Sequence, residues 1–215
     1  MRFVLNDKGP QWTLIDLYGE KPALTVDFSR PALASRRRKV SIRAELLIKA
    51  INQGPGARVL DMTAGLGTDA FILAAYGHQV VMLERSKTVY LLTQNGLDRA
   101  AENPSLKPIV ERMLLYHWDS TIPFAAAKGF DAAIVDPMFE AKKKNALSKG
   151  EMQMLQSFIG KGAELTPFLS AASQLGIKRS IVKRPRSDRL VHHDPRPVYQ
   201  LEGRRSRLDV FLNSA

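Results

Sequence analysis

The chain has 215 residues, of which 45% are hydrophobic and 25% charged, a balance typical of globular proteins. This balance excludes a mostly disordered chain, a collagen-like chain and a coiled coil, and the absence of cysteine excludes disulfide frameworks, thiolate metal sites and cysteine nucleophiles. With 32 lysines and arginines against 21 aspartates and glutamates, the formal net charge is +11, which favours a polyanionic partner such as nucleic acid or an anionic membrane surface.

Membrane insertion is not expected. No stretch of the sequence approaches the roughly 20 consecutive apolar residues that a membrane-spanning helix needs. Asn6, Asp7, Lys8 and Pro10 interrupt the first ten positions, before the apolar core of a signal peptide is formed. We therefore expect a soluble, cytoplasmic protein.

The first 28 residues contain three short stretches, 2–6, 11–17 and 23–28, that mix apolar residues with β-branched or aromatic ones. Turn-forming residues separate the stretches, so the simplest prediction is a small antiparallel meander.

A basic segment follows at residues 29–39 and includes Arg36, Arg37 and Arg38. Such a run is typical of a solvated loop, but on a chain of this charge it is also a candidate contact for phosphate groups. We place a boundary after this segment, which separates a small β extension with its basic loop (1–39) from the main domain (40–215).

The main domain begins with a helical pattern that ends at residues 54–56, and strand-like runs then alternate with helical ones. The predicted strands are 58–62, 79–83, 113–117, 131–135 and 180–183, and the predicted helices are 69–76, 89–101, 148–159 and 165–175. Segments 198–201 and 208–212 read as a closing hairpin. The predicted fold class is α/β, with a doubly wound, mostly parallel sheet and an antiparallel hairpin at the carboxyl end.

Ligands of such sheets bind beyond the carboxyl ends of the strands, and the first of these ends carries a glycine loop. Gly65 and Gly67 allow the backbone to turn tightly and to approach a ligand closely. The spacing Gly65-x-Gly67-x-x-Ala70 also matches a variant of the dinucleotide fingerprint, so an NAD-dependent oxidoreductase is an alternative.

Acidic residues at the next strand ends favour a ligand of the adenosine type. Glu84 follows the second strand, where a carboxylate accepts hydrogen bonds from ribose hydroxyls of either NAD or S-adenosylmethionine. Asp61 stands beside the glycine loop, where it can hold an ammonium group but would repel a pyrophosphate. Asp119 and Ser120 follow the third strand and can bind the adenine amino edge, or Asp119 can simply cap the next segment.

The fourth strand ends in Asp136-Pro137-Met138-Phe139, the most specific motif of the chain. Methyl transfer to an exocyclic amine needs alignment and acceptors for the amine hydrogens, and the Asp136 carboxylate and Pro137 carbonyl can supply those acceptors. Phe139 can stack on a flipped base. The alternative is an Asp-Pro turn with Phe139 in the core.

With these motifs the chain resembles the class I S-adenosylmethionine-dependent methyltransferases, and more closely the RsmJ family of small-subunit ribosomal RNA guanine-N2 methyltransferases. The resemblance extends in order from about residue 30 to the end. The stretches that carry it are DMTAGLGTDAF (61–71), MLERS (82–86), VDPMF (135–139), KKKNALSKGEMQMLQSFIG (142–160), VKRP (182–185) and GRRSRLDVF (203–211).

The resemblance implies S-adenosyl-L-methionine as cofactor and methylation of a guanine N2 amine in small-subunit ribosomal RNA. The family's ligand positions correspond to Thr68, Asp69, Glu84, Arg85, Asp119, Ser120 and Asp136, to which the strand-end arguments add Asp61, Gly65 and Gly67. The predicted catalytic residues are Asp136, Pro137 and Phe139.

Further cations follow the later strands, and we expect them to contact RNA together with the arginines of segment 29–39. These are Lys142, Lys143, Lys144, Lys183 and Arg184. The run His192-His193-Asp194 lies among prolines and arginines, so we predict a loop there and no metal. Besides the oxidoreductase, two alternatives stay open: a methyltransferase of another RNA or DNA base amine, and a non-enzymatic RNA-binding protein.

Overall fold

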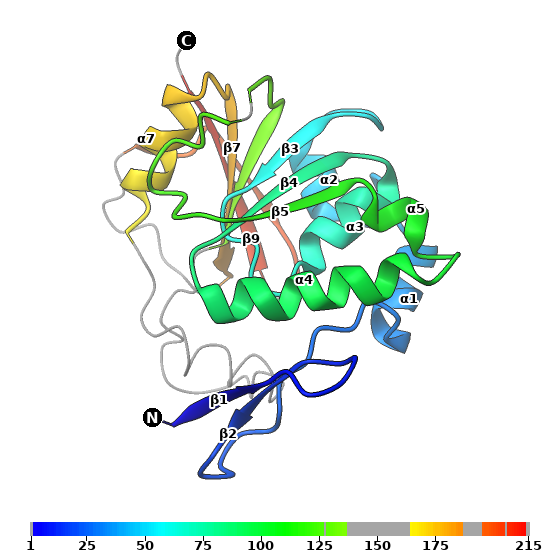
Figure 1. Cartoon of the computed structure of the whole chain (residues 1–215). Helices are drawn as coiled ribbons and strands as arrows, with labels where there is room; N and C mark the ends of the chain where they lie inside the picture. The colour runs from blue at the N-terminus through cyan, green and yellow to red at the C-terminus, as the bar shows by residue number, and fades with distance from the viewer. Residues whose placement is uncertain (1, 127, 137–163, 187–194, 205, 214–215) are drawn as a thin grey trace.

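The structure is a computed structural model, and it describes residues 2–126, 128–136, 164–186, 195–204 and 206–213. Within these residues a seven-stranded sheet has the order β5-β4-β3-β6-β7-β9-β8 (Figure 1). In chain order its strands are β3 (Arg58–Asp61), β4 (Gln79–Glu84), β5 (Met113–His117), β6 (Ala132–Val135), β7 (Arg179–Pro185), β8 (Tyr199–Glu202) and β9 (Ser206–Leu212). The predicted helix 148–159 lies outside the described residues.

The sheet is parallel from β5 through β7, and β9 pairs antiparallel with both β7 and β8. The predicted doubly wound, mostly parallel sheet with a closing antiparallel hairpin is confirmed. From β3 the chain proceeds outward to β4 and β5, then returns to place β6 on the other side of β3. This reversal of strand order is the topological switch point, beyond which ligands of open α/β sheets bind.

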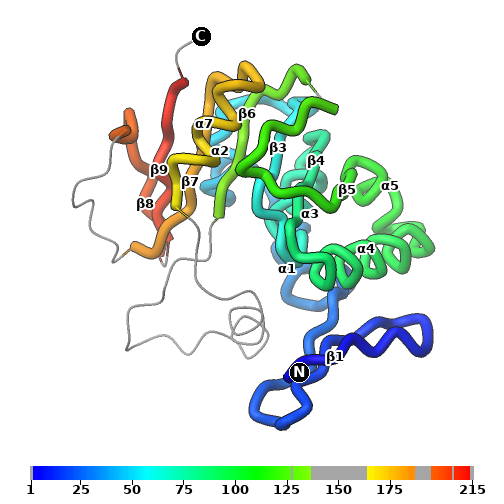
Figure 2. The backbone as a smooth tube through the Cα atoms, turned by 60° about the vertical axis from the view of Figure 1, so that its left-hand side comes forward, coloured from blue at the N-terminus to red at the C-terminus, as the bar shows by residue number. Residues whose placement is uncertain are grey.

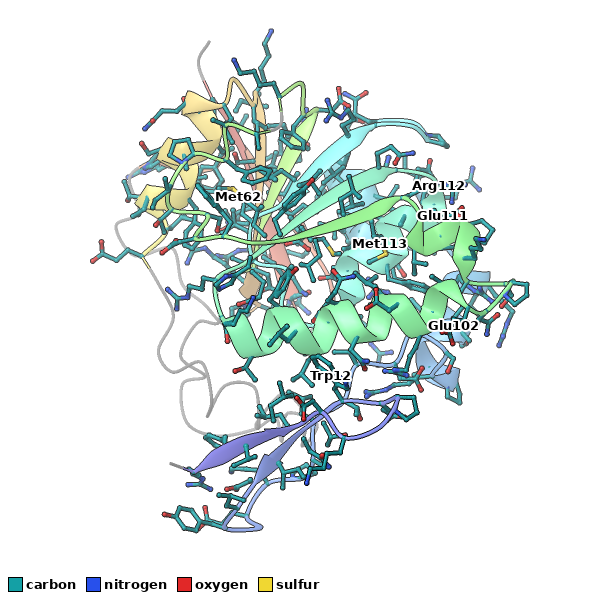
Figure 3. The ribbon with its side chains drawn as sticks, viewed as in Figure 1. Trp12, Met62, Glu102, Glu111, Arg112 and Met113 are labelled. Atoms are coloured by element: carbon teal, nitrogen blue, oxygen red, sulfur yellow. The ribbon has the colours of Figure 1, made fainter. Side chains whose placement is uncertain are left out.

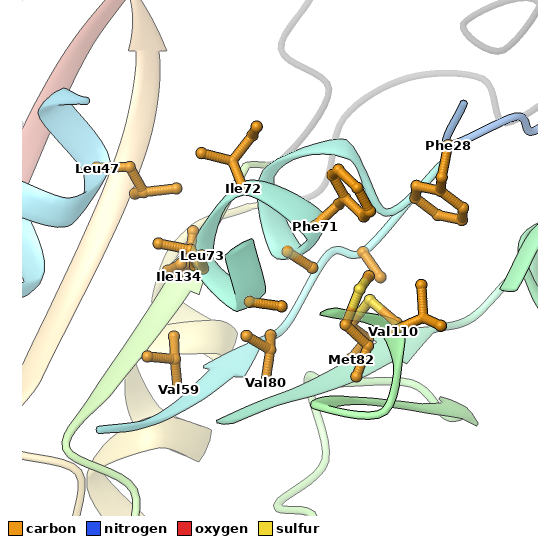
Figure 4. Packing of buried hydrophobic residues seen from close by; sticks show 14 of the residues in the cluster. Phe28, Leu47, Val59, Phe71, Ile72, Leu73, Val80, Met82, Val110 and Ile134 are labelled. Atoms are coloured by element: carbon orange, nitrogen blue, oxygen red, sulfur yellow. The ribbon is translucent and has the colours of Figure 1, made fainter. Parts of the chain in front are cut away.

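Helices cover both faces of the sheet (Figures 1 and 2). They are α1 (Pro31–Arg38), α2 (Leu46–Ile51), α3 (Thr68–Tyr76), α4 (Lys87–Ala101), α5 (Lys107–Val110) and α7 (Thr166–Gln174). Because successive side chains of a strand point to opposite faces, each buried strand contributes to two cores. In β3, for example, Val59 joins the core under α2, α3 and α4 (Figure 4), whereas Leu60 joins the core under α7.

The amino-terminal extension differs from the predicted meander. Strands β1 (Phe3–Asn6) and β2 (Thr13–Asp16) form an antiparallel pair, but the third stretch joins them only through a bridge between Leu14 and Leu24. The reason is packing, since Leu24, Val26 and Phe28 are buried in the same core as α3 and α4 rather than in a separate sheet.

The extension lies along α4 (Figure 1). The Trp12 backbone N–H donates to Asn95 of α4 at 3.0 Å, and the Asn95 side chain donates to the Pro10 carbonyl at the same distance. Figure 3 places Trp12 between the β1–β2 pair and α4.

The basic segment 29–39 is a helix rather than the predicted loop. Pro31 occupies the first turn of α1, where its missing N–H costs nothing, and alanine and leucine follow. Arg36, Arg37 and Arg38 form its last turn, where positive charge is favoured by the helix dipole. The helical pattern expected after residue 40 is also shorter than predicted, because α2 begins only at Leu46 and is capped by Asn52 in the left-handed conformation.

Candidate active site

The loop between β3 and α3 turns at two glycines. Gly65 and Gly67 have φ angles of 52° and 70°, a left-handed backbone in which a side chain is strained. A Cβ atom on Gly67 would lie 3.2 Å from the ring of Phe28, which stacks on Phe71 with centroids 5.1 Å apart (Figure 4). An aromatic residue of the amino-terminal extension therefore helps to shape the glycine loop.

The segment that follows β3 is bonded to three other strand ends. The Gly65 N–H donates to Glu84 at the end of β4, and the Met62 carbonyl accepts from the Ser120 hydroxyl beyond β5. Thr63 Oγ1 accepts the N–H of Asp136 beyond β6 at 2.6 Å. The polar residues predicted at four separate strand ends thus meet at one edge of the sheet.

Glu84 is buried, and both of its carboxylate oxygens accept backbone N–H groups. Oε2 accepts from Gly65 at 3.0 Å and Oε1 from Ser86 at 2.7 Å. Burial raises the pKa of Glu84, while the two N–H groups act in the opposite direction. Each oxygen keeps a second lone pair, so the fixed carboxylate can still accept hydrogen bonds from the hydroxyls of a ribose.

Asp61 is a buried carboxyl at the end of β3. Its Oδ1 accepts the N–H of Thr63 at 3.1 Å. Burial raises the pKa of Asp61 to about 7, and the nearby carboxylates of Asp69 and Asp136 add to that rise. A bound ammonium group would stabilise the ionised form, so the site fits the α-amino group of S-adenosylmethionine and not a pyrophosphate.

Four charged side chains form a connected network beside Asp61. Asp69, in the first turn of α3, pairs through one oxygen with Lys183 of β7 at 2.6 Å and through the other with Arg36 of α1 at 3.1 Å. Lys183 also reaches Asp136 Oδ2 at 2.8 Å. Although burial opposes it, the pairing with Lys183 and Arg36 lowers the pKa of Asp69 to about 2.

Asp136 is the first residue of the predicted catalytic motif, and its position is fixed from two sides. Its backbone N–H is bonded to Thr63, and its carboxylate is bonded to Lys183. Burial raises the pKa of Asp136 and Asp69 raises it further, whereas Lys183 lowers it. Pro137 and Phe139, together with Lys142, Lys143 and Lys144, lie outside the described residues.

The third strand end is more open to solvent. Ser120 is buried and donates to the Met62 carbonyl, whereas Asp119 is exposed and accepts the backbone N–H of Thr121 at 3.0 Å and its hydroxyl at 2.7 Å. The bonds from Thr121 lower the pKa of Asp119, so its carboxylate is ionised.

Thr68 and Arg85, two other predicted ligands of the cofactor, are exposed in the structure. Thr68 is the first residue of α3, and Arg85 directly follows β4. Both therefore lie at the carboxyl edge of the sheet, and no hydrogen bond or ion pair with another described residue fixes their side chains there.

Several residues predicted to contact RNA have other roles in the structure. Arg184 is a correction: its side chain is 2% exposed and pairs with Asp209 of β9 at 3.1 Å, so it is not a surface cation. Arg36 is held by Glu45 at 2.7 Å as well as by Asp69. Arg37 donates to the Ser105 carbonyl, and Arg38 is exposed.

Two contributors to this site were not singled out from the sequence. Thr63 is one, because a threonine in a strand-to-helix loop carries no distinctive signal. The pairing of Lys183 with Asp136 is the other, and here a signal exists. Strands four and five of a doubly wound sheet are neighbours, so a cation near the end of one lies beside an acid that follows the other.

Among the described residues, every helix is too short or too polar to cross a membrane. The same residues contain no group of three or more histidine, aspartate or glutamate side chains arranged to hold a metal ion.

The parallel sheet with its switch point, the glycine loop bonded to a buried glutamate and the acidic end of β6 define a class I S-adenosylmethionine-dependent methyltransferase. A family model described as putative SAM-dependent methyltransferase matches residues 5–213. The crystal structure of a SAM-dependent methyltransferase from Neisseria gonorrhoeae is 31% identical with a TM-score of 0.73, covering 97% of this chain and 81% of that chain.

Curated relatives specify the family within this class. The ribosomal RNA small subunit methyltransferase J of Dechloromonas aromatica is 41% identical over 192 residues, covering 87% of this chain and 78% of the relative. That of Pseudomonas aeruginosa is 37% identical over 207 residues, covering 94% and 79%. The chain belongs to the family of ribosomal RNA small subunit methyltransferase J, and the alternative of an NAD-dependent oxidoreductase is set aside.

Proposed function

We propose that the protein transfers a methyl group from S-adenosylmethionine to the exocyclic N2 amine of a guanine in small-subunit ribosomal RNA. The observation that carries the proposal is the placement of Asp136. Its carboxylate stands at the end of β6, bonded to Lys183 at 2.8 Å, and its backbone is tied to the loop that follows β3. An acceptor for amine hydrogens is thereby held next to the proposed cofactor site. The names of the relatives support the choice of ribosomal RNA.

The cofactor would lie across the ends of β3, β4 and β5. Asp61 would hold its α-amino group, and Glu84 would accept from the ribose hydroxyls. Asp119 and the Ser120 oxygen would accept from the adenine amine, since the Ser120 proton is already donated to Met62. The remaining residues of the proposed cofactor site are Gly65, Gly67, Thr68, Asp69, Arg85 and Asp136.

When bound, S-adenosylmethionine supplies a methyl group that its sulfonium has already activated. The protein therefore has to align the amine and accept its hydrogens rather than generate a strong base. Asp136 would accept a hydrogen bond from N2 and take up the proton that N2 releases once the new nitrogen–carbon bond has formed. By family resemblance, the Pro137 carbonyl would be a second acceptor and Phe139 would stack on the flipped guanine.

The proposed RNA contacts begin with two arginines of α1 that form no ion pair with an acid of the described residues. Arg38 at the end of α1 is exposed, and Arg37 lies beside it. The proposed RNA contacts also include Lys142, Lys143 and Lys144, which are assigned from the sequence alone. Arg184 is not included because it is buried, and Arg36 is not included because two acids hold it.

Methyl transfer with product analysis tests this function. Small ribosomal subunits that lack the modification would be incubated with the protein and S-adenosylmethionine carrying a labelled methyl group, and their nucleosides would be analysed by mass spectrometry. We expect labelled N2-methylguanosine, and none with subunits that already carry the modification. A different methylated nucleoside, or no transfer to subunits or to free RNA despite measurable cofactor binding, would contradict the proposal.

A further inference from the structure

Lys183 occupies a position that the sequence alone assigned to RNA binding. Val182 of β7 is in register with Val135, the last residue of β6, so Lys183 inside β7 lies beside Asp136, which directly follows β6. The Lys183 ammonium lies 2.8 Å from Asp136 Oδ2 and 2.6 Å from Asp69 Oδ2. Its side chain is 32% exposed.

The carboxyl groups around Lys183 pair with its ammonium group and disfavour the binding of a phosphate. Asp69 and Asp136 raise the pKa of Lys183 above its ordinary value, against the effect of burial. Asp61 belongs to the same cluster, because Asp69, Asp136 and Lys183 all act on its pKa. A phosphate that approached Lys183 would meet this group of carboxyls and would be repelled.

We propose that Lys183 is a positioning residue that keeps Asp136 ionised and aims its carboxylate at the amine of the guanine, and that Lys183 does not bind RNA phosphate. The inference rests on the proposed function, in which Asp136 is the acceptor. Asp136 can take up the proton that N2 releases only as a carboxylate, since a protonated carboxyl already carries a proton and turns one of its oxygens from an acceptor into an O–H donor.

The charges around Asp136 explain why a cation is needed there. Burial and the Asp69 carboxylate both favour the protonated form of Asp136, and Lys183 opposes them. Arg36, the other cation of the network, pairs with Asp69 and Glu45. Without the Lys183 charge, Asp136 would be left beside the acids Asp69 of α3 and Asp61 of β3. The pKa of Asp136 would therefore rise.

The decisive variant is Lys183→Met, with Lys183→Gln as a second neutral variant whose amide keeps polar contacts in the network. Lys178→Met is the matched control, because Lys178 is an exposed lysine just before the same strand. Two properties would be measured in the full chain. One is the titration of the Asp136 carboxyl by carbon-13 NMR, assigned with Asp136→Asn. The other is the pH profile of single-turnover methyl transfer at saturating cofactor.

We expect the Asp136 titration to move to higher pH in both neutral variants, and the acidic limb of the rate profile to move with it. The rate at neutral pH should fall by about 10²-fold, as expected when a reacting group loses its alignment. RNA affinity should stay as in the unmodified protein, and Lys178→Met should change none of these properties. The Lys183→Gln result decides the matter if Lys183→Met does not fold.

The opposite result would be an unmoved Asp136 titration together with weaker RNA binding and a reduced salt dependence of that binding. It would make Lys183 a phosphate contact and overturn the inference. The carboxyl titration needs no RNA and no turnover. If the unmodified protein methylated no guanine, the proposed function would fail while the role of Lys183 toward Asp136 would still be decided.

Discussion

Asp61 illustrates how a strand end sets the charge of one side chain. Burial raises its pKa to about 7, and Asp69 and Asp136 contribute in the same direction. In the unfolded chain the pKa of this carboxyl is near its ordinary value of 3.8. Its folded-state pKa is raised, so the folded protein binds more protons than the unfolded chain between these two values, and stability falls as the pH rises through that window.

Replacing Asp61 by asparagine should therefore have opposite effects on stability and binding. Near pH 7 and above, the cofactor-free Asp61→Asn protein should unfold at a higher temperature, because the ionisation of a buried carboxyl is removed. Its affinity for S-adenosylmethionine should fall and should lose the rise with pH that the ionisation of Asp61 gives the unmodified protein. Thermal unfolding and calorimetric titration across neutral pH measure both effects.

Asp98→Asn, on the exposed side of α4, is a suitable control. Among the described residues, the Asp98 side chain accepts a hydrogen bond only from Gln94 of the same helix. This variant should leave both properties unchanged. Equal cofactor affinity in Asp61→Asn and the unmodified protein would contradict the assignment of Asp61 to the amino group.

At the level of elements, Gly96 decides how closely the amino-terminal extension approaches α4. A Cβ atom at this position would lie 2.6 Å from Val26 Cγ1 and 3.1 Å from the Val26 carbonyl oxygen. The same carbonyl accepts from Arg99, one turn further along the helix. A glycine inside a helix is ordinarily unfavourable by about 1 kcal/mol relative to alanine, so its presence here reflects the contact with Val26.

Gly96→Ala should consequently destabilise the protein, although alanine is the better helix former. Overpacking of this kind costs about 1–3 kcal/mol, which outweighs the gain in helix propensity. Denaturant unfolding measures the difference, with Gly54→Ala as the control, because a Cβ atom at Gly54 meets nothing within 4 Å. An increase in stability for Gly96→Ala would show that the extension does not rest on α4 as described.

Elements also mark the limit of what the sequence predicts. The alternation of strands and helices could be predicted because buried parallel strands are short apolar runs with polar residues at their ends. Helix α1 could not be predicted in this way, since the four consecutive cations at and just beyond its end (Arg36 to Lys39) conceal the favourable start at Pro31 and Ala32. The third stretch of the extension has the composition of a strand, but its apolar residues are used in the main core.

Site residues were predictable where they follow a strand directly, and less so where their role depends on a neighbouring strand. Lys183 and Arg184 are adjacent in β7, so their side chains point to opposite faces. One reaches Asp136, and the other reaches Asp209 on β9. Distinguishing the two requires the knowledge that β9 is inserted beside β7, which comes from the sheet order and not from the local sequence.

At the scale of the whole molecule, the network of Arg36, Asp69, Lys183 and Asp136 connects the amino-terminal helix to the fourth strand end. Phe28 makes a second connection by packing beside the glycine loop. The extension and the sheet therefore share both the hydrophobic core and the proposed active site.

The most direct test of the account is single-turnover methyl transfer by Asp136→Ala at saturating S-adenosylmethionine, with unmodified small subunits as substrate. We expect a rate at least about 10²-fold below that of the unmodified protein, because the acceptor for the amine hydrogens is lost. Glu111→Ala, an exposed acid that precedes β5 at the opposite edge of the sheet, should retain the full rate. An undiminished rate in Asp136→Ala, with circular dichroism and unfolding temperature as in the unmodified protein, would contradict the proposed mechanism.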